Sequence, residues 1–409
     1  MSTPSTTRRR TRRTLAAASL AALALVAGCG TSSSGDGDGD ATGAGGFQAP
    51  DLPMLDAIGD GEGELDVLAW PGYAEDGSNF KDVDWVTPFE DKTGCQVTVK
   101  DFGTSDDAVS LMHSGGYDVV SASGDATLRL IAAGDVEPVN TDLVPNYADL
   151  SPFLKDQDFN SVDGQLYGIP HGWGANVLMY NTEKVSPAPT SWSAVFDDSS
   201  QYKGEVTAYD SPIYIADAAL YLMNTQPDLG IEDPYALDTD QLAAAVDLLK
   251  AQNANVGEYW GDYATEVSAF KTGASVIGTA WQVNANIAAE KAPVDTVFPE
   301  EEGSTGWSDT WMVGSASEHK NCAYMWLDWI TSPDVQAQVG EYFGEAPANP
   351  KACDLTSKGF CDTFHVTDAA YADKIWYWTT PIAQCLDGRT DVDCTTYADW
   401  TDAWTEVKG

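Results

Sequence analysis

Short apolar runs alternate along the chain with segments whose apolar residues recur at helical spacing. From Glu64 onward, the runs are typical of buried strands and the segments between them of helices that cover a sheet. This alternation predicts an α/β fold. The predicted strands are 65–70, 95–99, 117–120 and 176–180, and the predicted helices lie near 83–93 and around 128–131.

Two further segments have amphipathic helical patterns: one ends at Lys250, and the other runs from Ala323 to Tyr342. Their apolar positions are expected to face the core. Because the 346 residues from Glu64 to Gly409 exceed the usual size of one hydrophobic core, we expect two α/β lobes. The aromatic run 375–378 is expected to pack in a core rather than to line a binding site.

The N-terminus has the pattern of a bacterial export signal. Five arginines precede an apolar run from Leu15 to Ala27, which is too short to span a membrane. The box 25–29, Leu-Val-Ala-Gly-Cys, resembles a lipobox, which implies a signal peptide over 1–28 and an acylated Cys29. The pair Arg12-Arg13 leaves open whether export uses the general or the twin-arginine route.

Residues 29–63 are rich in Gly, Ser, Asp and Ala, so we expect them to form a disordered linker. The Asp-Gly alternation at 36–40 lacks the closing Glu of a calcium loop and is read as linker. Together these features predict an exported protein that is either lipid-anchored through Cys29 to the outer face of the cytoplasmic membrane or periplasmic.

The net charge of the chain is strongly negative, which limits the kinds of partner it can bind. The chain has 63 acidic and 21 basic residues, a formal charge of −42, and removal of 1–28 takes away five arginines and no acids, which gives −47. Such a chain is not expected to bind nucleic acid or an anionic lipid surface. The charge itself is typical of a solvated surface that keeps an exported protein soluble.

Six cysteines follow Cys29, an even number in an oxidising compartment, so three disulfides are expected. Six cysteines allow 15 pairings, and the sequence leaves the choice open. Closeness favours Cys353 with Cys361 and Cys385 with Cys394, with Cys95 and Cys322 as the long-range pair. A metal site is not expected, because no Cys-x-x-Cys occurs and the four histidines are scattered.

Five stretches in this order resemble the extracellular solute-binding proteins of ABC importers, and within them the spermidine/putrescine-binding family. Each stretch is a weak motif by itself, and the order of the five carries the resemblance. They are Val67 to Trp70, 117–123 (Tyr-Asp-Val-Val-Ser-Ala-Ser), Gly273 to Trp281, 306–309 (Gly-Trp-Ser-Asp) and 344–349 (Gly-Glu-Ala-Pro-Ala-Asn).

The resemblance implies a periplasmic-binding-protein-like fold, in which two α/β lobes close like a hinge on a ligand between them. The chain would cross between lobes near 169–173 and near Trp307. Lobe 1 would comprise 64–170 with 308–409 returning to it, and lobe 2 would comprise 171–307. A monomer is expected, with an ABC permease in the cytoplasmic membrane as partner and no cofactor.

A polyamine site needs carboxylates for the ammonium groups and aromatic faces for the carbon stem. By the resemblance, Trp70, Trp281 and Trp307 would supply the faces, Asp309 an ammonium anchor and Ser123 a hydrogen bond. Trp70, Ser123, Trp281 and Trp307 also end predicted strands, where open sheets bind ligands. The expected function is capture of a small cationic solute, such as putrescine or spermidine, for delivery to the permease.

The chain departs from the family where lobe 2 has paired acids in the polyamine binders. Ser211 and Tyr214 stand at those two places, and Asp210 lies one position early. Asp125 and Glu345 stand where the family has aromatic residues. Asp125, Asp210, Tyr214 and Glu345 are therefore further expected contacts. The acids have moved around the pocket, or the ligand is another amine, such as a quaternary amine, a betaine or an amino-acid-like solute.

Two other classes of function would use different features of the sequence. An exported hydrolase would need a catalytic motif, and the sequence has no Gly-x-Ser-x-Gly, His-Glu-x-x-His or phosphate loop, so an enzyme is not expected. A sensor or adhesion lipoprotein could use the same two-lobed fold without transport.

Overall fold

The computed structural model describes residues 47–409. The expected signal peptide, Cys29 and the first part of the expected linker lie outside the described residues. Across 47–409, no helix combines the length and the apolar character that crossing a membrane requires.

The first half of the sheet belongs to lobe 1 and is parallel at its outer strands. Strand β1 pairs in parallel with β2 on one side and with β3 on the other. Their apolar residues are buried under the flanking helices. The elements of this lobe are β1 (Glu64–Ala69), α1 (Val86–Thr93), β2 (Gln96–Asp101), α2 (Ser105–Ser114), β3 (Val119–Ala122), α3 (Gly124–Ala133), β4 (Val136–Glu137), β5 (Ser161–Val162), β6 (Gln165–Leu166), α8 (Lys320–Ile330), α9 (Pro333–Val339), β13 (Ala346–Pro347), α10 (Phe360–Thr363) and α11 (Ala369–Ala372).

Lobe 2 repeats this arrangement around its own core. Strand β8 pairs in parallel with β9 and β10, and a separate cluster of buried side chains packs against them. Its elements are β8 (Val206–Tyr209), α4 (Ile215–Thr225), α5 (Thr239–Asn253), β9 (Val256–Trp260), α6 (Tyr263–Thr272), β10 (Ile277–Trp281), α7 (Gln282–Ala289), β11 (Val294–Val297) and α12 (Tyr397–Lys408).

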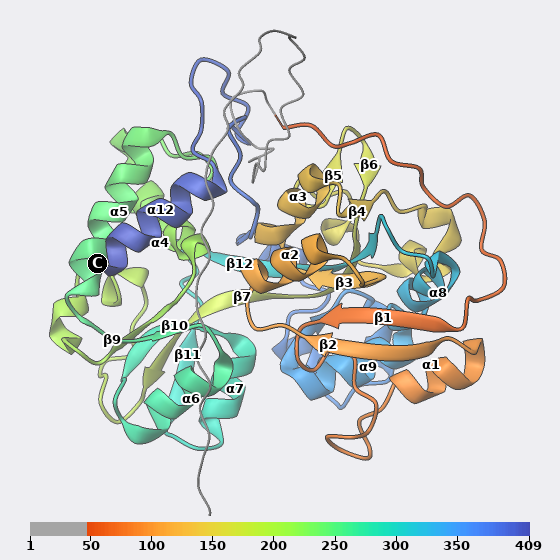
Figure 1. The fold of residues 1–409 in the computed structure, drawn as a ribbon. Coiled ribbons are helices and arrows are strands. Elements are labelled where there is room, and N and C mark those ends of the chain that lie inside the picture. The colour runs from red at the N-terminus through yellow and green to blue at the C-terminus, as the bar shows by residue number, and fades with distance from the viewer. Residues whose placement is uncertain (1–46) are drawn as a thin grey trace, which may run out of the picture. The chain divides into compact units, whose positions relative to one another are not determined.

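Two long antiparallel strands, β7 (Ile169–Asn181) and β12 (Ser304–Gly314), join the lobes (Figure 1). The last residues of β12 pair with β3 of lobe 1, while the last residues of β7 pair with β10 and β11 of lobe 2. The strand order is therefore β2-β1-β3-β12-β7-β10-β8-β9. A short third strand, β14 (Ile375–Tyr377), pairs with the first residues of β12.

The predicted helix over 323–342 is three pieces in the structure. Helix α8 ends at Ile330, and α9 begins with Pro333 in its first turn, where the missing N–H costs no hydrogen bond. A π-helical turn, Gly340–Gly344, follows α9. The helical spacing of the apolar residues continued across the break, but the proline ended the hydrogen-bonded ladder.

The expected disordered linker differs from the structure over 47–63. This segment has no helix or strand, yet it packs along lobe 1 and side chains hold it in place. Asn140 Nδ2 donates to the Leu55 carbonyl at 3.1 Å, and Glu62 accepts from the backbone N–H of Cys322 at 2.9 Å. The composition of 29–63 as a whole had suggested disorder, but Phe47, Leu55 and Ile58 pack against the core of lobe 1, and the polar contacts with distant residues add to this packing.

The expected return of 308–409 to lobe 1 also differs from the structure at its end. Helix α12 lies beside α5 (Figure 1), and Trp400, Trp404 and Val407 belong to the core of lobe 2. The apolar face of α12 completes the cover on that side of lobe 2.

The three disulfides join the pairs that sequence closeness favoured. Cys353 bonds Cys361, Cys385 bonds Cys394, and Cys95 bonds Cys322 across 227 positions.

Candidate functional site

A cavity of about 850 Å³ lies where the two lobes meet, and the carboxyl ends of strands from both lobes line it. Trp70 follows β1, Asp101 ends β2, Ser123 follows β3 and Trp281 ends β10. Parallel strands place their carboxyl ends at one edge of a sheet, so the two sheets bring these side chains to a common space.

The lining is aromatic and acidic. Twelve lining residues are Trp, Tyr or Phe, six are Asp or Glu, and within the described residues none of the lining side chains is Lys, Arg or His. Such a surface favours a positively charged ligand with an apolar part, because carboxylates pair with the charge and ring faces attract both. The six acids are Glu75, Asp101, Asp262, Glu290, Asp309 and Glu341.

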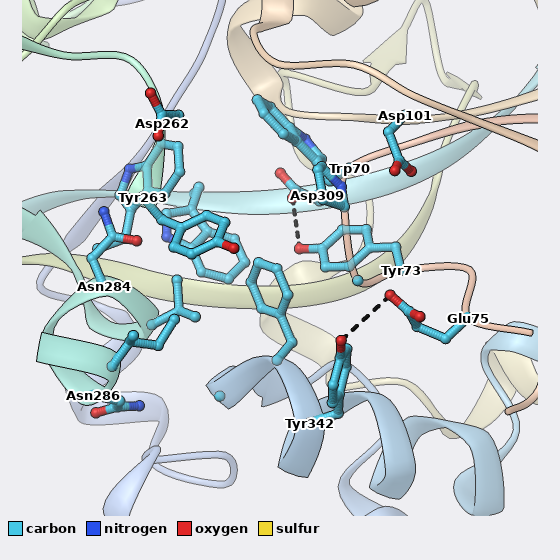
Figure 2. Close-up of a pocket in the computed structure, with 18 of the residues that line it drawn as sticks. Trp70, Tyr73, Glu75, Asp101, Asp262, Tyr263, Asn284, Asn286, Asp309 and Tyr342 are labelled. Carbon is cyan, nitrogen blue, oxygen red and sulfur yellow. Dashed lines mark hydrogen bonds between the residues drawn. The ribbon is translucent and has the colours of Figure 1, made fainter. Parts of the chain in front are cut away.

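Two of the six acids are buried, and both belong to the lobe 1 side. Asp309, on β12, is 4% exposed, and Glu75 is 7% exposed. Figure 2 shows Glu75 beside Tyr342, on the same side of the cavity as Trp70 and Tyr73. The opposite side carries Asn284 and Asn286 from α7. Its acids, Asp262 and Glu290, are exposed, so the buried negative charge is concentrated on one wall.

Asp309 is held by two hydroxyl groups. Ser123 Oγ donates to Asp309 Oδ1 at 2.6 Å, and Tyr73 Oη lies 2.8 Å from Asp309 Oδ2 (Figure 2). Burial raises the pKa of Asp309 to about 6, although both hydrogen bonds act to lower it. Near neutral pH, the group is therefore an anion without a cationic partner among the residues that line the cavity.

Beneath Asp309, Glu345 lies 2.9 Å from Tyr73 Oη through its Oε2. Burial, and then the charge of Asp309, raise the pKa of Glu345 well above its usual range. The Tyr73 hydroxyl group, which has a single proton to donate, lies within hydrogen-bond distance of both carboxyl groups. Tyr73 thus holds Asp309 in place from below.

The space for Glu345 depends on Gly172 of β7. A Cβ at position 172 would lie 2.4 Å from the Glu345 carboxyl carbon, so only glycine allows this approach. His171 Nε2 lies 3.6 Å from Glu345 Oε1, and burial lowers the pKa of His171 to about 3, so it is neutral. The layer under Asp309 therefore contains buried polar groups whose pKa shifts disfavour their charged forms.

The structure brings together at the cavity five of the nine residues that the sequence singled out. They are Trp70, Ser123, Trp281, Trp307 and Asp309. Trp70 and Trp281 come from different lobes, and their ring centroids are 6.2 Å apart at an interplanar angle of 75°. The indole N–H of Trp70 donates to Ser123 Oγ at 3.2 Å, which ties the aromatic wall to the Asp309 hydrogen bonds.

The other four expected contacts do not line the cavity. Asp125 is fully buried and accepts from Ser105 at 2.8 Å, and Tyr214 accepts from Gln252 at 2.8 Å. Asp210 pairs with Lys408, and Glu345 lies under Tyr73 as described. Correspondence with the family had placed all four at the cavity. In the structure, Asp125 lies in the first turn of α3 and Tyr214 in a 3₁₀ turn, and both side chains are buried within their lobes.

Sequence reasoning missed most of the polar lining. Asp101 and Phe102 could have been found, because they directly follow a predicted strand. Tyr73 and Glu75 lie in the irregular segment after β1, and Tyr342 and Phe343 lie in the π-helical turn. Hydrophobic periodicity gives no signal for such positions, although single π-helical turns are frequent at functional sites.

The sequence pattern of the bacterial extracellular solute-binding proteins matches residues 84–368, which is more than half of the chain. The chain belongs to this family. The spermidine/putrescine-binding periplasmic protein of Escherichia coli is 24% identical over 311 residues, with 75% of this chain and 83% of that protein covered. The putrescine-binding periplasmic protein SpuD of Pseudomonas aeruginosa is 25% identical over 349 residues, with 81% and 90% covered.

Among solved structures, the spermidine/putrescine ABC transporter substrate-binding protein PotD from Streptococcus pneumoniae superposes with a TM-score of 0.65. It is 19% identical, and the match covers 85% of this chain and 99% of that one. This likeness shows a periplasmic-binding-protein-like fold for this solute-binding protein. The family relatives are binding proteins rather than enzymes.

Proposed function

We propose that this solute-binding protein captures a small cationic amine of the polyamine class, such as putrescine or spermidine, and delivers it to an ABC permease. The observation that carries the proposal is the buried Asp309 carboxylate, which faces an aromatic cavity without a basic lining residue among 47–409. The names of the curated relatives, which are spermidine- and putrescine-binding proteins, support the same ligand class.

In this proposal, one ammonium group of the ligand pairs with Asp309. A second ammonium group, where the ligand has one, can pair with Glu75, the other buried acid of the lining. The carbon stem lies against Trp70, Trp281 and Trp307. Strands β7 and β12 act as the hinge, so that ligand contacts from both walls favour the closed arrangement of the lobes. An acyl anchor on Cys29 would keep the loaded protein at a high effective concentration near the permease.

A second candidate is another amine with a single positive charge, such as a quaternary amine, a betaine or an amino-acid-like solute. The observation in its favour is the lobe 2 wall, where the acids that line the cavity, Asp262 and Glu290, are exposed and Asp210 is already paired with Lys408. A ligand with one positively charged group, paired with Asp309, would then satisfy the buried charge of the cavity.

A panel of ligands tests the proposal. The chain with Cys29→Ser, which prevents acylation, is mixed with putrescine, spermidine, choline, glycine betaine, γ-aminobutyrate or a neutral sugar. A ligand at about a hundredfold its Kd adds roughly 2.7 kcal/mol to the unfolding free energy, which a thermal-shift assay detects, and calorimetry gives the Kd. Stabilisation by a polyamine is the expected result. Stabilisation only by a singly charged amine favours the second candidate, and no response to any amine contradicts both and favours a sensor or adhesion role.

Cation affinity is expected to fall in mild acid. Because burial raises the pKa of Asp309 to about 6, the anion that pairs with the ligand is lost as pH falls through 6. Polyamines stay fully charged over this range, so Kd should rise about tenfold between pH 7.5 and pH 5, as expected for one proton at this pKa. Calorimetry at both pH values measures the change. A Kd that is unchanged or lower at pH 5 would contradict the anchor role of Asp309.

A further inference from the structure

The C-terminal segment from Ile375 to Gly409 lies beyond the part of the chain that matches the family, which ends at 368. It begins as β14, in parallel register with the start of β12. The backbone N–H of Trp378 then donates to the Gly306 carbonyl at 2.7 Å, one residue before Trp307. The segment therefore enters the hinge region beside a strand that carries cavity residues.

Trp378 is 2% exposed and belongs to the core of lobe 2, as expected for the run 375–378, and it also lines the cavity. Its ring lies parallel to Tyr209, with an interplanar angle of 5° and centroids 5.6 Å apart. Its centroid is 6.2 Å from that of Trp281, at 63°. Trp378 and Trp281 thus form two adjoining aromatic walls, and their ring positions are fixed by packing behind them.

The backbone of Trp378 is also fixed against the residues that hold Asp309. A Cβ at Gly124 would lie 1.7 Å from the Trp378 carbonyl oxygen, so the two backbones touch. The N–H of Thr380 donates to the Gly124 carbonyl at 3.0 Å. Because Gly124 directly follows Ser123, the segment is attached to lobe 1 beside the hydroxyl group that binds Asp309.

The end of the same segment pairs with Asp210, a carboxylate of lobe 2. Lys408 Nζ lies 2.6 and 2.5 Å from the two oxygens of Asp210, and Trp404 Nε1 donates to Asp210 Oδ1 at 3.1 Å. The disulfide Cys385–Cys394 closes the loop in between. The segment therefore neutralises one carboxylate of lobe 2 and adds one aromatic ring to the cavity.

We propose that Trp378 is a ligand-contacting residue, supplied by the C-terminal segment, that packs against the carbon stem of the cation anchored at Asp309. The inference rests on the proposed function, because it takes the ligand to be an amine with a methylene or methyl part. It goes further in assigning a ligand contact to Trp378 of the C-terminal segment.

The test uses Trp378→Ala, Trp378→Phe and a matched control, Trp376→Ala. Trp376 lies two positions earlier in the same segment, is half-buried, and is not among the lining residues. Its backbone carbonyl, which accepts from Tyr235 at 2.8 Å, survives the substitution. With the tightest amine of the panel, Kd is expected to rise at least tenfold for Trp378→Ala, less than threefold for Trp378→Phe and less than twofold for Trp376→Ala.

A second measurement covers the case in which Trp378→Ala does not fold. The chain is labelled with 5-fluorotryptophan, and the ¹⁹F resonance that is missing from the Trp378→Phe spectrum is assigned to Trp378. The amine should shift this resonance and leave that of Trp376 nearly unchanged. An unshifted Trp378 resonance in the loaded protein would overturn the inference.

The outcomes separate the two proposals. If Trp378→Ala binds within twofold of the wild type while Asp309→Asn does not bind, the inference is overturned and the proposed function stands. Equal weakening by Trp376→Ala also overturns it, because the effect is then one of folding. If the wild type binds no amine of the panel, the proposed function and this inference are both overturned.

Discussion

Replacing Asp309 with asparagine is expected to weaken cation binding by at least about a hundredfold, the largest effect on binding of any single change at the cavity. The substitution keeps the size of the side chain and one oxygen that can accept a hydrogen bond, but it removes the buried negative charge. Loss of one partner of a buried ion pair costs about 2–5 kcal/mol, and each 1.4 kcal/mol is a tenfold change in Kd. Calorimetry with the tightest amine of the panel measures the loss.

The same change should not destabilise the ligand-free protein. Burial raises the pKa of Asp309 to about 6, above its value in the unfolded chain, so the folded state is destabilised by the ionised carboxylate as pH rises through this range. The asparagine variant lacks that cost and should melt no lower than the wild type at pH 7.5. A loss of binding at unchanged melting temperature therefore reports on the ligand and not on folding.

Asp101→Asn is the matched control, since Asp101 lines the same cavity but is exposed. Solvent screens an exposed carboxylate, so its loss should change Kd less than threefold. If Asp309→Asn binds within threefold of the wild type, Asp309 is not the anchor, and Glu75, the other buried acid of the lining, becomes the first group to test.

Removal of the long-range disulfide is expected to have the largest effect on stability. Cys95 and Cys322 are both fully buried and are joined across 227 positions. In the double variant Cys95→Ala/Cys322→Ala, the unfolded chain regains the freedom that this closed loop removes. The chain-entropy relation gives a loss of about 5 kcal/mol in the free energy of unfolding. The midpoint of urea unfolding in an oxidising buffer measures it.

Cys353→Ala/Cys361→Ala provides the comparison, because that disulfide closes a loop across only 8 positions. The same relation gives about 2.5 kcal/mol for so short a loop. The long-range variant should therefore unfold at clearly lower urea than the short-range one. Equal midpoints would show that loop length does not govern the contribution of these disulfides.

The local sequence was sufficient to predict several strands of both lobes and part of the candidate site. Apolar runs predicted strands that became β1, β3 and the second half of β7, because a strand buried on both faces needs a continuous apolar run. The positions of Trp70, Ser123 and Trp281 followed from the strands they end. These predictions depend only on neighbours in sequence, and the alternation of elements then limits the fold to α/β layers.

The predictions failed where distant residues decide the outcome. Segment 47–63 belongs to a region that was expected to be disordered, yet Phe47, Leu55 and Ile58 pack against the core of lobe 1, and hydrogen bonds with Asn140 and Cys322 hold the segment there. Asp210 had the position of a ligand contact, and Lys408, 198 positions later, pairs with it instead. No local pattern encodes such pairs, because each partner is ordinary in its own surroundings.

The sequence by itself predicted an α/β chain of acidic composition, with strands that end at Trp70 and Trp281 and a carboxylate at position 309. Only the tertiary structure decided which acids are buried and charged, which are neutralised, and that Trp378 reaches the cavity from the far end of the chain. The physical reason is that the burial and the pairing of a charged side chain depend on contacts with segments from both lobes. The periodicity of apolar residues indicates only which face of a segment packs against its own sheet.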